Sequence, residues 1–315
     1  MGGLSFIQSL VYTDGNNKFY MKRDDLLPFS FGGNKVRIAE KYFNDMERKK
    51  CNCIITYGSS QSNLCRVIAN MAKQKNIDCY VVSPVDESEK KNTNNAILVS
   101  LSEANIIKCS KNNVANTIND LIKNLKELGK KPYYIYGDIY GKGNEIVPMY
   151  AYFEAYEEIK EYEKQHSVKF DYIFHASGTG TTQSGLISGM LKNNDMKKII
   201  GISIARLEEQ QKKNIFDNVT LFTGIKNKEL IDNSINFQDK YICGGYGKYN
   251  EEIVNIVRWV LTSDAIPLDL TYTGKAFWGM NEYLKENEVI GKNILFIHTG
   301  GLPIFFDNLD ILNIK

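Results

Sequence analysis

Residues 170–192 read FDYIFHASGTGTTQSGLISGMLK, and this segment combines a strand, a loop and a helix. YIFHA is a short apolar run typical of a buried strand, whereas TQSGLISGMLK is typical of a helix. IIGISIA (199–205) follows as the next apolar run. Because strand, helix and strand alternate, we expect a parallel sheet with a crossover helix.

The N-terminal half repeats this alternation. In NKVRIAEKYFNDMERKK (34–50) the apolar residues share one helical face: Val36, Ala39, Tyr42, Phe43 and Met46. CIITYG (53–58) and DCYVVSP (78–84) predict buried strands, with a helix at 62–75 between them. A long helix at 149–165 marks the expected junction between two α/β domains.

Other segments carry weaker patterns. Residues 1–21 predict short strands joined by a hairpin turn at 15–17, and PYYIYGD (132–138) predicts a strand. Residues 85–98 are polar and predict a surface loop that leads into a helix. Residues 206–240 are polar and poorly periodic, so no regular element is assigned to them.

The composition excludes several classes of function. Lys and Arg number 39 against 37 for Asp and Glu, and a net charge of +2 does not favour nucleic acid or an anionic membrane. The six cysteines form no CxxC pair and the three histidines form no ligand pattern, so we expect no metal site. The N-terminus lacks the features of a signal peptide, and no apolar run reaches membrane-spanning length. We therefore expect a cytoplasmic protein.

The loop SGTGTT (177–182) has the composition of a phosphate cradle. Its glycines let backbone N–H groups turn inward, its hydroxyls add donors, and the following helix directs its positive end at the same point. The loop lacks GK[ST] and the GxGxxG register, so a single phosphate suits it better than a nucleotide. The alternative is a tight helix N-terminus with capping threonines.

A second polar loop, GSSQSN (58–63), also lies between a strand and a helix. Its donors could hold a carboxylate at the helix N-terminus, and Ser62 could carry a proton. The alternative is a simple N-cap.

KRDDLLPFSFGGNK (22–35) ends in a lysine after two glycines, which would leave room for a cofactor beside a reactive amine. Taken alone, Lys35 is better explained as part of a loop before a helix, and the KRDD cluster is predicted to be structural. His298 is predicted to be a satisfied core histidine. Tyr246, in GGYG, could be a catalytic acid or a buried aromatic.

Six motifs occur here in the order seen in the D-cysteine desulfhydrase and aminocyclopropane-carboxylate deaminase family: KRDDL, GGNK with Arg37 following, QSN with Arg66 following, SGTGTTQSGL, YTGKA and HTGG. From about Lys22 to Pro303 the chain resembles these pyridoxal-phosphate enzymes of the tryptophan-synthase-β-like fold, type II. The resemblance implies an α/β architecture of two three-layer α/β/α domains with mostly parallel sheets and the active site between them. Residues 1–44 and 160–315 would form the large cofactor-binding domain and 45–159 the small domain. A homodimer is also implied.

The resemblance assigns roles by position. Lys35 would form the Schiff base with the aldehyde of pyridoxal 5′-phosphate, and Asn63 would bond the ring hydroxyl or the substrate. Gln61 and Ser62 would hold the carboxylate of a small amino-acid substrate. The phosphate would be bound by Gly178, Thr179, Gly180, Thr181 and Thr182.

The remaining roles fall on the last motifs. Tyr272 would stack on the ring, and Thr273 or Thr299 would meet the pyridine nitrogen. Tyr246 matches a tyrosine near the substrate in relatives. The catalytic set implied in this way is Lys35, Ser62, Tyr246 and Tyr272.

The residue at 273 bears on the reaction. Aminocyclopropane-carboxylate deaminases carry a glutamate there, which keeps the ring nitrogen protonated, whereas Thr273 is neutral and implies a weaker electron sink. We therefore expect α,β-elimination, with D-cysteine as the leading substrate.

Other readings stay open. They are an aminocyclopropane-carboxylate deaminase, another deaminase, a racemase, a β-replacement enzyme, a non-catalytic relative and a nucleotide-binding α/β protein. The chain departs from the family where Ile38 and Ala39 follow the arginine, and where Tyr57, Ser59 and Ser60 replace a glycine-rich lead into QSN.

Overall fold

The computed structural model describes residues 5–59, 61–85 and 93–312. The chain forms two compact units, which we call unit 1 (Lys35–Pro148) and unit 2 (Gly2–Asn34 with Met149–Lys315). The boundaries predicted at 44/45 and 159/160 fall inside the helices α1 (Asn34–Arg48) and α5 (Tyr150–His166). The units instead divide near the first residue of each helix, so that each helix belongs almost wholly to one unit.

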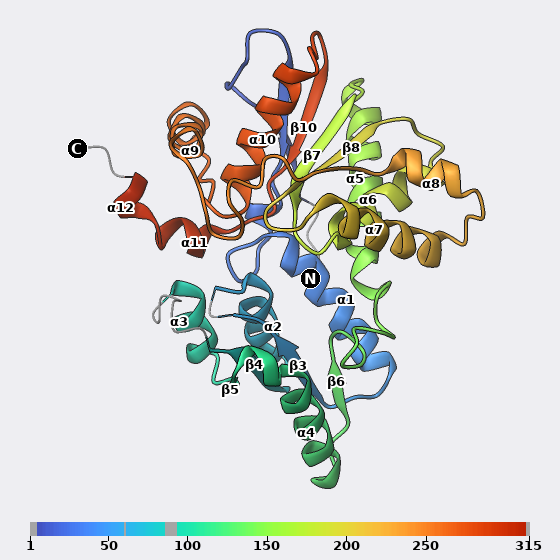
Figure 1. The fold of residues 1–315 in the computed structure, drawn as a ribbon, viewed down its shortest axis with the longest axis vertical. Helices are drawn as coiled ribbons and strands as arrows, with labels where there is room; N and C mark the ends of the chain where they lie inside the picture. Colours follow the sequence, from blue (N-terminus) through green and yellow to red (C-terminus); the bar gives the residue numbers. More distant parts are fainter. Residues whose placement is uncertain (1–4, 60, 86–92, 313–315) are drawn as a thin grey trace. The chain divides into compact units, whose positions relative to one another are not determined.

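Unit 2 contains a six-stranded sheet with the strand order β1-β2-β10-β7-β8-β9 (Figure 1). The strands are β1 (Ile7–Ser9), β2 (Lys18–Lys22), β7 (Tyr172–Ser177), β8 (Lys198–Ser203), β9 (Asn236–Gln238) and β10 (Asn293–Ile297). β1 and β2 are antiparallel, as predicted for the N-terminal hairpin, and the other neighbours are parallel. The predicted parallel sheet is confirmed.

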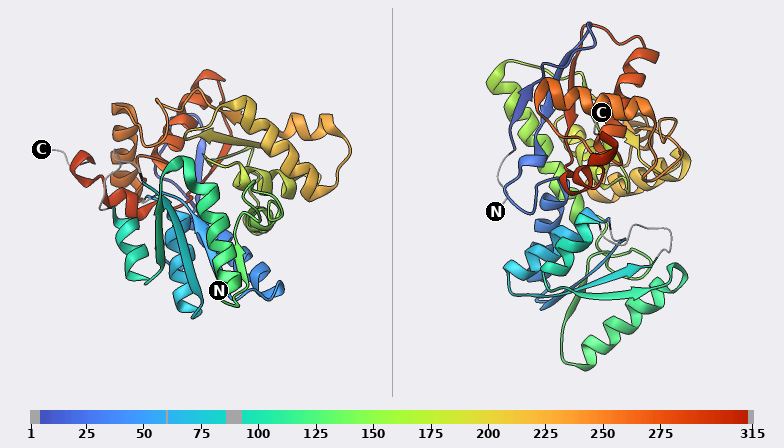
Figure 2. Two further views of the ribbon diagram at one scale, coloured as in Figure 1. Left: turned by 60° about the horizontal axis from the view of Figure 1, so that its bottom comes forward. Right: turned by 90° about the vertical axis from the view of Figure 1, so that its left-hand side faces the viewer.

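Helices cover both faces of this sheet (Figure 2). Phe174 of β7 enters a core with α9 and α10, whereas Gln183 of α6 lies against Gly201 of β8 on the opposite face. The helices of unit 2 besides α5 are α6 (Thr181–Lys192), α7 (Glu208–Thr223), α8 (Lys228–Ser234), α9 (Glu251–Asp264), α10 (Thr273–Glu286), α11 (Leu302–Phe306) and α12 (Leu309–Leu312). A 3-10 turn at Asp24–Leu26 completes the set, and a second 3-10 turn, Val147–Met149, lies where the chain passes from unit 1 to unit 2.

Unit 1 contains a four-stranded parallel sheet with the order β5-β4-β3-β6. Its strands are β3 (Cys53–Tyr57), β4 (Asp78–Pro84), β5 (Asn105–Cys109) and β6 (Pro132–Tyr134), and its helices besides α1 are α2 (Asn63–Gln74), α3 (Asn94–Leu101) and α4 (Val114–Glu127), with a 3-10 turn at Lys111–Asn113. Ile55 packs with Ile118 of α4, and Thr56 on the other face meets Cys65 of α2. This unit is also a three-layer arrangement.

Two sequence expectations need correction. Residues 206–240, which lack a clear period, form α7, α8 and β9. The buried stripe of α7 is only Gln211, Ile215 and Val219, and such a narrow stripe with a glutamine in it gives little periodic signal. The strand expected over 132–138 ends at Tyr134.

The carboxyl ends of β2, β10 and β7 lie side by side, because these strands are parallel neighbours. The loops that follow them are residues 23–33, 298–301 and 178–180. Three motifs far apart in the sequence therefore begin at one edge of one sheet. In open α/β sheets, ligands bind at such carboxyl ends.

The KRDD cluster anchors the first of these loops. The Lys22 ammonium lies 2.5 Å from Glu158 of α5, and the Tyr152 hydroxyl donates to Asp24 over 2.6 Å. The backbone carbonyl of Asp24 accepts the N–H of Gly33 over 2.7 Å. Lys22 and Asp24 are fully buried, so this cluster is structural.

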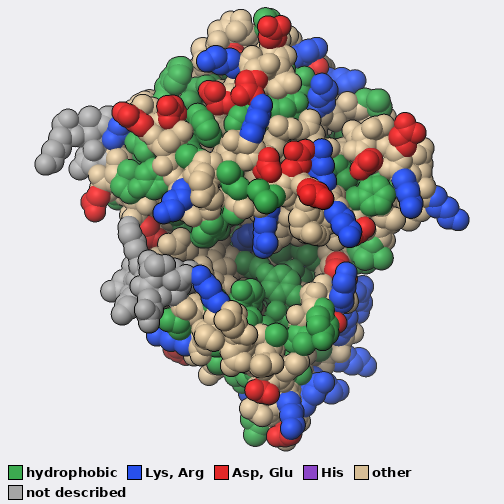
Figure 3. All heavy atoms as spheres, in the orientation of Figure 1, with side chains coloured by type: hydrophobic (Ala, Val, Ile, Leu, Met, Phe, Trp, Pro, Cys, Tyr) green, Lys and Arg blue, Asp and Glu red, His purple; other side chains and the backbone are tan. Residues whose placement is uncertain are grey.

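Basic and acidic side chains lie among one another on the face of unit 2 drawn in Figure 3. Within the described ranges, no helix combines the length and the apolar character that crossing a membrane requires.

Asp24→Ala tests the anchoring role of the cluster. The substitution leaves the Tyr152 hydroxyl and the Lys22 ammonium short of a buried acceptor, and we expect a loss of about 3–5 kcal/mol in the free energy of unfolding. Urea denaturation measures it. Asp217→Ala, at an exposed position of α7, is the control and should change stability by less than about 0.5 kcal/mol. Equal effects of the two substitutions would contradict the anchoring role.

Candidate active site

The loop between β7 and α6 leads into a helix N-terminus that no side chain of the N-cap residue caps. α6 begins at Thr181, and its N-cap Gly180 (φ +84°) has no side chain to accept the first-turn N–H groups. The positive φ of Gly180 favours glycine, and a Cβ there would also displace Gln211 Nε2, which would lie 2.2 Å away. The hydroxyls of Thr179 and Thr181 lie 3.1 Å apart beside these donors. The loop can therefore bind a phosphate at a helix N-terminus.

The GGN segment touches the HTGG segment through its backbone. The N–H of Asn34 donates to Thr299 O over 3.1 Å, and its side-chain amide donates to Thr182 Oγ1 over 3.4 Å. A Cβ at Gly33 (φ +98°) would lie 2.7 Å from Thr299 O. These contacts hold the end of loop 23–33 beside the phosphate loop.

Gly32 and Gly33 were predicted to leave room for a cofactor, and the structure gives another explanation for them. A Cβ at Gly32 would lie 1.9 Å from the carbonyl oxygen of Asp25, and the space beside Gly33 is filled by Thr299. The glycines therefore allow one backbone segment to pack on another. They do not keep room for a cofactor.

Lys35 follows Asn34 directly and is the first residue of unit 1. It lies in the first turn of α1 and is half-buried. Burial lowers the pKa of its amine from 10.5 to about 8. A larger fraction of neutral amine near neutral pH makes Lys35 a suitable nucleophile for an aldehyde.

Tyr246 and Tyr272 form a pair. Their hydroxyls lie 2.8 Å apart, and their rings meet edge to face with centroids 5.9 Å apart. Burial, followed by the charge of Tyr246, raises the pKa of Tyr272 well above 10. Tyr272 is therefore neutral near neutral pH, and its hydroxyl can donate a hydrogen bond.

The structure gives Thr273 a partner that the sequence did not suggest. Its hydroxyl donates to Asp269 Oδ2 over 2.8 Å and accepts from the N–H of Asp269 over 2.9 Å. The Asp269 carboxylate also accepts the N–H groups of Thr271, Tyr272 and Thr273. Thr273 is fully buried, so its proton is committed to Asp269. In the described part of the chain, the Thr299 hydroxyl forms no hydrogen bond, and Thr299 is the better partner for a ring nitrogen.

Lys275 holds the turn that carries Tyr246. Its buried ammonium donates to the carbonyls of Ile242 (2.8 Å), Gly245 (2.6 Å) and Ile204 (3.4 Å). Asp269 and Lys275 lie beside or within predicted motifs, yet no sequence pattern gave them a role. Their function depends on backbone groups that only the fold brings near.

The second polar loop belongs to unit 1. Ser62 is the N-cap of α2, and its Oγ accepts the N–H of Cys65 over 3.2 Å. The hydroxyl proton of Ser62 can still be donated to a ligand. Asn63 is the first residue of the helix, and Gln61 precedes the cap. Ser60 lies outside the described residues.

His298 is satisfied, as predicted. Its Nε2 lies 2.9 Å from Pro267 O, and its Nδ1 accepts the N–H of Gly300 over 3.1 Å. Among the residues that the structure describes, no group of three or more His, Cys, Asp or Glu side chains could hold a metal ion.

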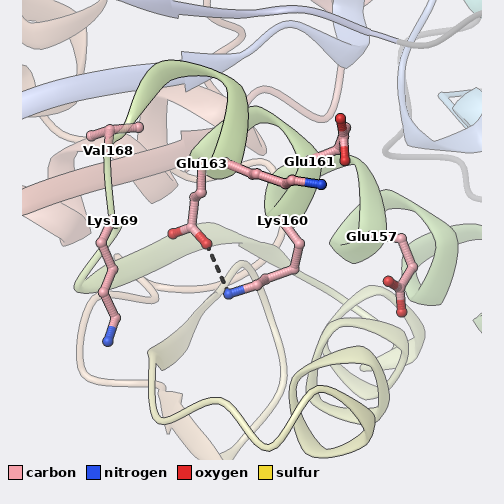
Figure 4. A pocket seen from close by; sticks show the side chains of 7 residues that line it. Glu157, Lys160, Glu161, Glu163, Val168 and Lys169 are labelled. Atoms are coloured by element: carbon pink, nitrogen blue, oxygen red, sulfur yellow. Dashed lines mark ion pairs between the residues drawn. The ribbon is translucent and has the colours of Figure 1, made fainter.

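A cavity of about 450 Å³ lies along α5, away from these motifs (Figure 4). Lys160 and Glu163 line it and form an ion pair of 3.1 Å. Asp195 accepts from Lys160 and from Tyr156, so these charges satisfy one another. None of the predicted site residues lines this cavity.

Comparisons with known proteins cover nearly the whole chain. A family model described as pyridoxal-phosphate dependent enzyme matches residues 7–300. A putative 1-aminocyclopropane-1-carboxylate deaminase of Pyrococcus abyssi is 31% identical over 91% of this chain and 85% of its own length. A D-cysteine desulfhydrase of Serratia proteamaculans is 28% identical over 92% of this chain and 88% of its own length.

Solved structures agree. The crystal structure of an aminocyclopropane-carboxylate deaminase homologue has a TM-score of 0.83 and 31% identity, over 98% of this chain and 92% of that chain. A hydrogen sulfide-producing enzyme of Fusobacterium nucleatum shares the fold, with a TM-score of 0.67 and 19% identity over 96% of each chain.

The residues present fit pyridoxal phosphate. The uncapped N-terminus of α6 supplies donors for one phosphate, and Lys35 supplies an amine with a lowered pKa. Asn34 connects the two groups along the chain, because its side chain donates to Thr182 and Lys35 is the next residue.

The lowered pKa of Lys35 predicts how cofactor capture depends on pH. Only the neutral amine attacks the aldehyde, so the capture rate of the apo-protein should rise about tenfold from pH 7 to pH 10 and level off above about pH 8. A lysine with an ordinary pKa would give a rise of several hundredfold, roughly, over the same range. The growth of the visible absorbance band after mixing measures the rate, and Lys35→Arg should give no band. A rate that climbs steadily to pH 10 would contradict the lowered pKa.

The two threonines can be told apart by substitution. Thr299→Val should weaken binding of pyridoxal phosphate about fivefold, the value of one neutral hydrogen bond. Thr273→Val should instead lower the free energy of unfolding by about 1–3 kcal/mol, because it strips a donor from the buried Asp269 carboxylate. Cofactor titration and urea denaturation measure the two effects, and an exchange of the two results would reverse the assignment.

Proposed function

The chain belongs to the family of pyridoxal-phosphate-dependent enzymes, and we propose that it catalyses α,β-elimination from a small amino acid, with D-cysteine as the leading substrate. The observation that carries the choice of reaction is that Thr273 and Thr299, the two candidate partners of the ring nitrogen, are both neutral. A neutral partner leaves the ring a weaker electron sink, which suits a substrate with a good leaving group.

Each group of the chain then has a task. When bound, pyridoxal phosphate withdraws electrons from the α-carbon of the amino acid attached to it. The donors of loop 177–182 would hold the phosphate, and Ser62 with Gln61 would hold the substrate carboxylate. Lys35 Nζ would bind the cofactor and later remove the α-proton.

The tyrosine pair would supply the proton for the leaving group. Both hydroxyls carry a proton near neutral pH, and they lie 2.8 Å apart, so a proton can pass between them. The pair can therefore donate a proton to the departing sulfur. With one water, D-cysteine would give pyruvate, ammonia and hydrogen sulfide, which balances the reaction.

A second candidate is aminocyclopropane-carboxylate deamination. The relative from Pyrococcus abyssi, at 31% identity, carries that name as a putative function. A deaminase of another amino acid, a racemase and a β-replacement enzyme share the same cofactor chemistry. As part of the same proposal, we expect a cytoplasmic homodimer.

Product analysis decides between these substrates. We expect the protein loaded with pyridoxal phosphate to form pyruvate and sulfide from D-cysteine, and Lys35→Ala to lower the rate by about 10²–10⁴-fold or more. Tyr246→Phe should lower kcat, whereas Tyr249→Phe, a similarly exposed tyrosine nearby, should not. Turnover of aminocyclopropane-carboxylate without turnover of D-cysteine would overturn the proposed reaction.

A further inference from the structure

We propose that Asn95 and Arg66 fix the orientation of the Asn63 side-chain amide, so that Asn63 offers only N–H donors to its ligand. Asn95 and Arg66 are thus positioning residues that act through Asn63. The identity of the ligand rests on the proposed function, whereas the orientation itself rests on contacts within unit 1.

Three side chains, those of Asn63, Arg66 and Asn95, are joined pairwise by hydrogen bonds. Asn63 Oδ1 accepts from Arg66 Nη1 over 2.8 Å and from Asn95 Nδ2 over 3.0 Å. Asn95 Oδ1 accepts from the same Arg66 nitrogen over 2.8 Å. Arg66 is 1% exposed and Asn95 is fully buried, so water has little access to the bond between them.

The guanidinium decides which way both amides point. The oxygen and nitrogen of an amide can exchange places by a flip, but a guanidinium has donors and no acceptor. The atoms of Asn63 and Asn95 that face Arg66 must therefore be oxygens. This leaves Asn95 Nδ2 as the donor to Asn63 Oδ1, and a flipped Asn63 would set its own N–H groups against two donors.

Asn95 also fixes the loop that contains Asn63. Its Nδ2 donates to the backbone carbonyl of Gln61 over 2.8 Å. Asn95 is itself held in place at the start of α3, where the buried N-cap Thr93 accepts the N–H of Ala96. Residues 85–98 were predicted to form a surface loop that leads into a helix; the helix is α3, but Asn95 within it is buried.

The fixed amide defines the chemistry of the ligand atom. Because both acceptor positions of Asn63 Oδ1 are used, its free Nδ2 can bind only an acceptor. The N-terminus of α2 favours negative charge. An anionic oxygen fits, and under the proposed function it would be the ring phenolate of the cofactor or the carboxylate of the substrate.

Asn95→Asp is the decisive variant, since it changes one atom and keeps an acceptor for Arg66. A carboxylate cannot donate to Asn63 Oδ1 and places an oxygen against it, so the Asn63 amide meets an acceptor at position 95 and the donor of Arg66 and is no longer held in one orientation. We expect a loss of at least tenfold in the binding of the anionic oxygen. A lower affinity of the apo-protein for pyridoxal phosphate identifies the ring oxygen, and a higher KM for D-cysteine with unchanged cofactor affinity identifies the carboxylate.

A double-mutant cycle shows whether Asn95 acts through Asn63. In an Asn63→Ala background, Asn95→Asp should weaken binding clearly less than in the wild type, and the remaining loss comes from the missing bond to Gln61 O. Asn70→Asp is the control, because it makes the same chemical change in α2, two turns after Asn63, where Asn70 donates to Ser102. It should leave the affinity for pyridoxal phosphate and the KM for D-cysteine as in the wild type. An Asn95→Asp protein within twofold of the wild type, or an equal loss in both backgrounds, would overturn the proposal.

The melting temperatures of the same four cofactor-free proteins test this proposal separately from the proposed function. The four are the wild type, the two single variants and the double variant. Coupling between positions 63 and 95 requires no ligand, so it is expected even if the wild type fails to bind pyridoxal phosphate or to turn over D-cysteine. Those failures would overturn the proposed function alone. If the effects of the substitutions at positions 63 and 95 on the melting temperature were additive, only the positioning role of Asn95 would be overturned.

Discussion

The backbone contact between Gly33 and Thr299 is the constraint on which the site depends. The two segments are distant in the sequence, and each leaves a strand of the same sheet at its carboxyl end. A Cβ at Gly33 or at Gly300 would lie less than 3 Å from the opposing backbone, so the two segments touch without side chains between them. The hydrogen bond from Asn34 to Thr299 then fixes the point at which α1 begins, and Lys35 is the next residue.

The sheets could be predicted because their strands are buried. YIFHA and CIITY are apolar runs with little polar interruption, and a strand covered on both faces by helices requires that composition. α1 was predicted for a related reason, since its inward residues Val36 and Phe43 recur at helical spacing and are buried. α7 was missed because burying Gln211 in a narrow stripe leaves no apolar period to detect.

The candidate site could be predicted only where one segment supplies it. Loop 177–182 carries its own glycines, hydroxyls and helix start, so its donors are visible in the sequence. The residues that orient the other site side chains lie outside the motifs that contain those side chains. Asn95 lies 32 residues from Asn63 in a polar stretch without a pattern, and nothing in the sequence indicates that Asp269 accepts the hydroxyl of Thr273.

The buried charges of Asp269 and Lys275 are satisfied by hydrogen bonds to backbone groups. These bonds order Tyr246 and Tyr272 before a ligand binds. Asp269 is surrounded by three N–H groups of the turn that leads to Tyr272. Lys275 is surrounded by three carbonyls, two of them in the turn that leads to Tyr246. A direct ion pair would satisfy the same charges but would leave both turns unrestrained. Because each charge instead binds a turn, the two hydroxyls are held 2.8 Å apart by the fold itself, and little ordering remains to be done when the ligand arrives.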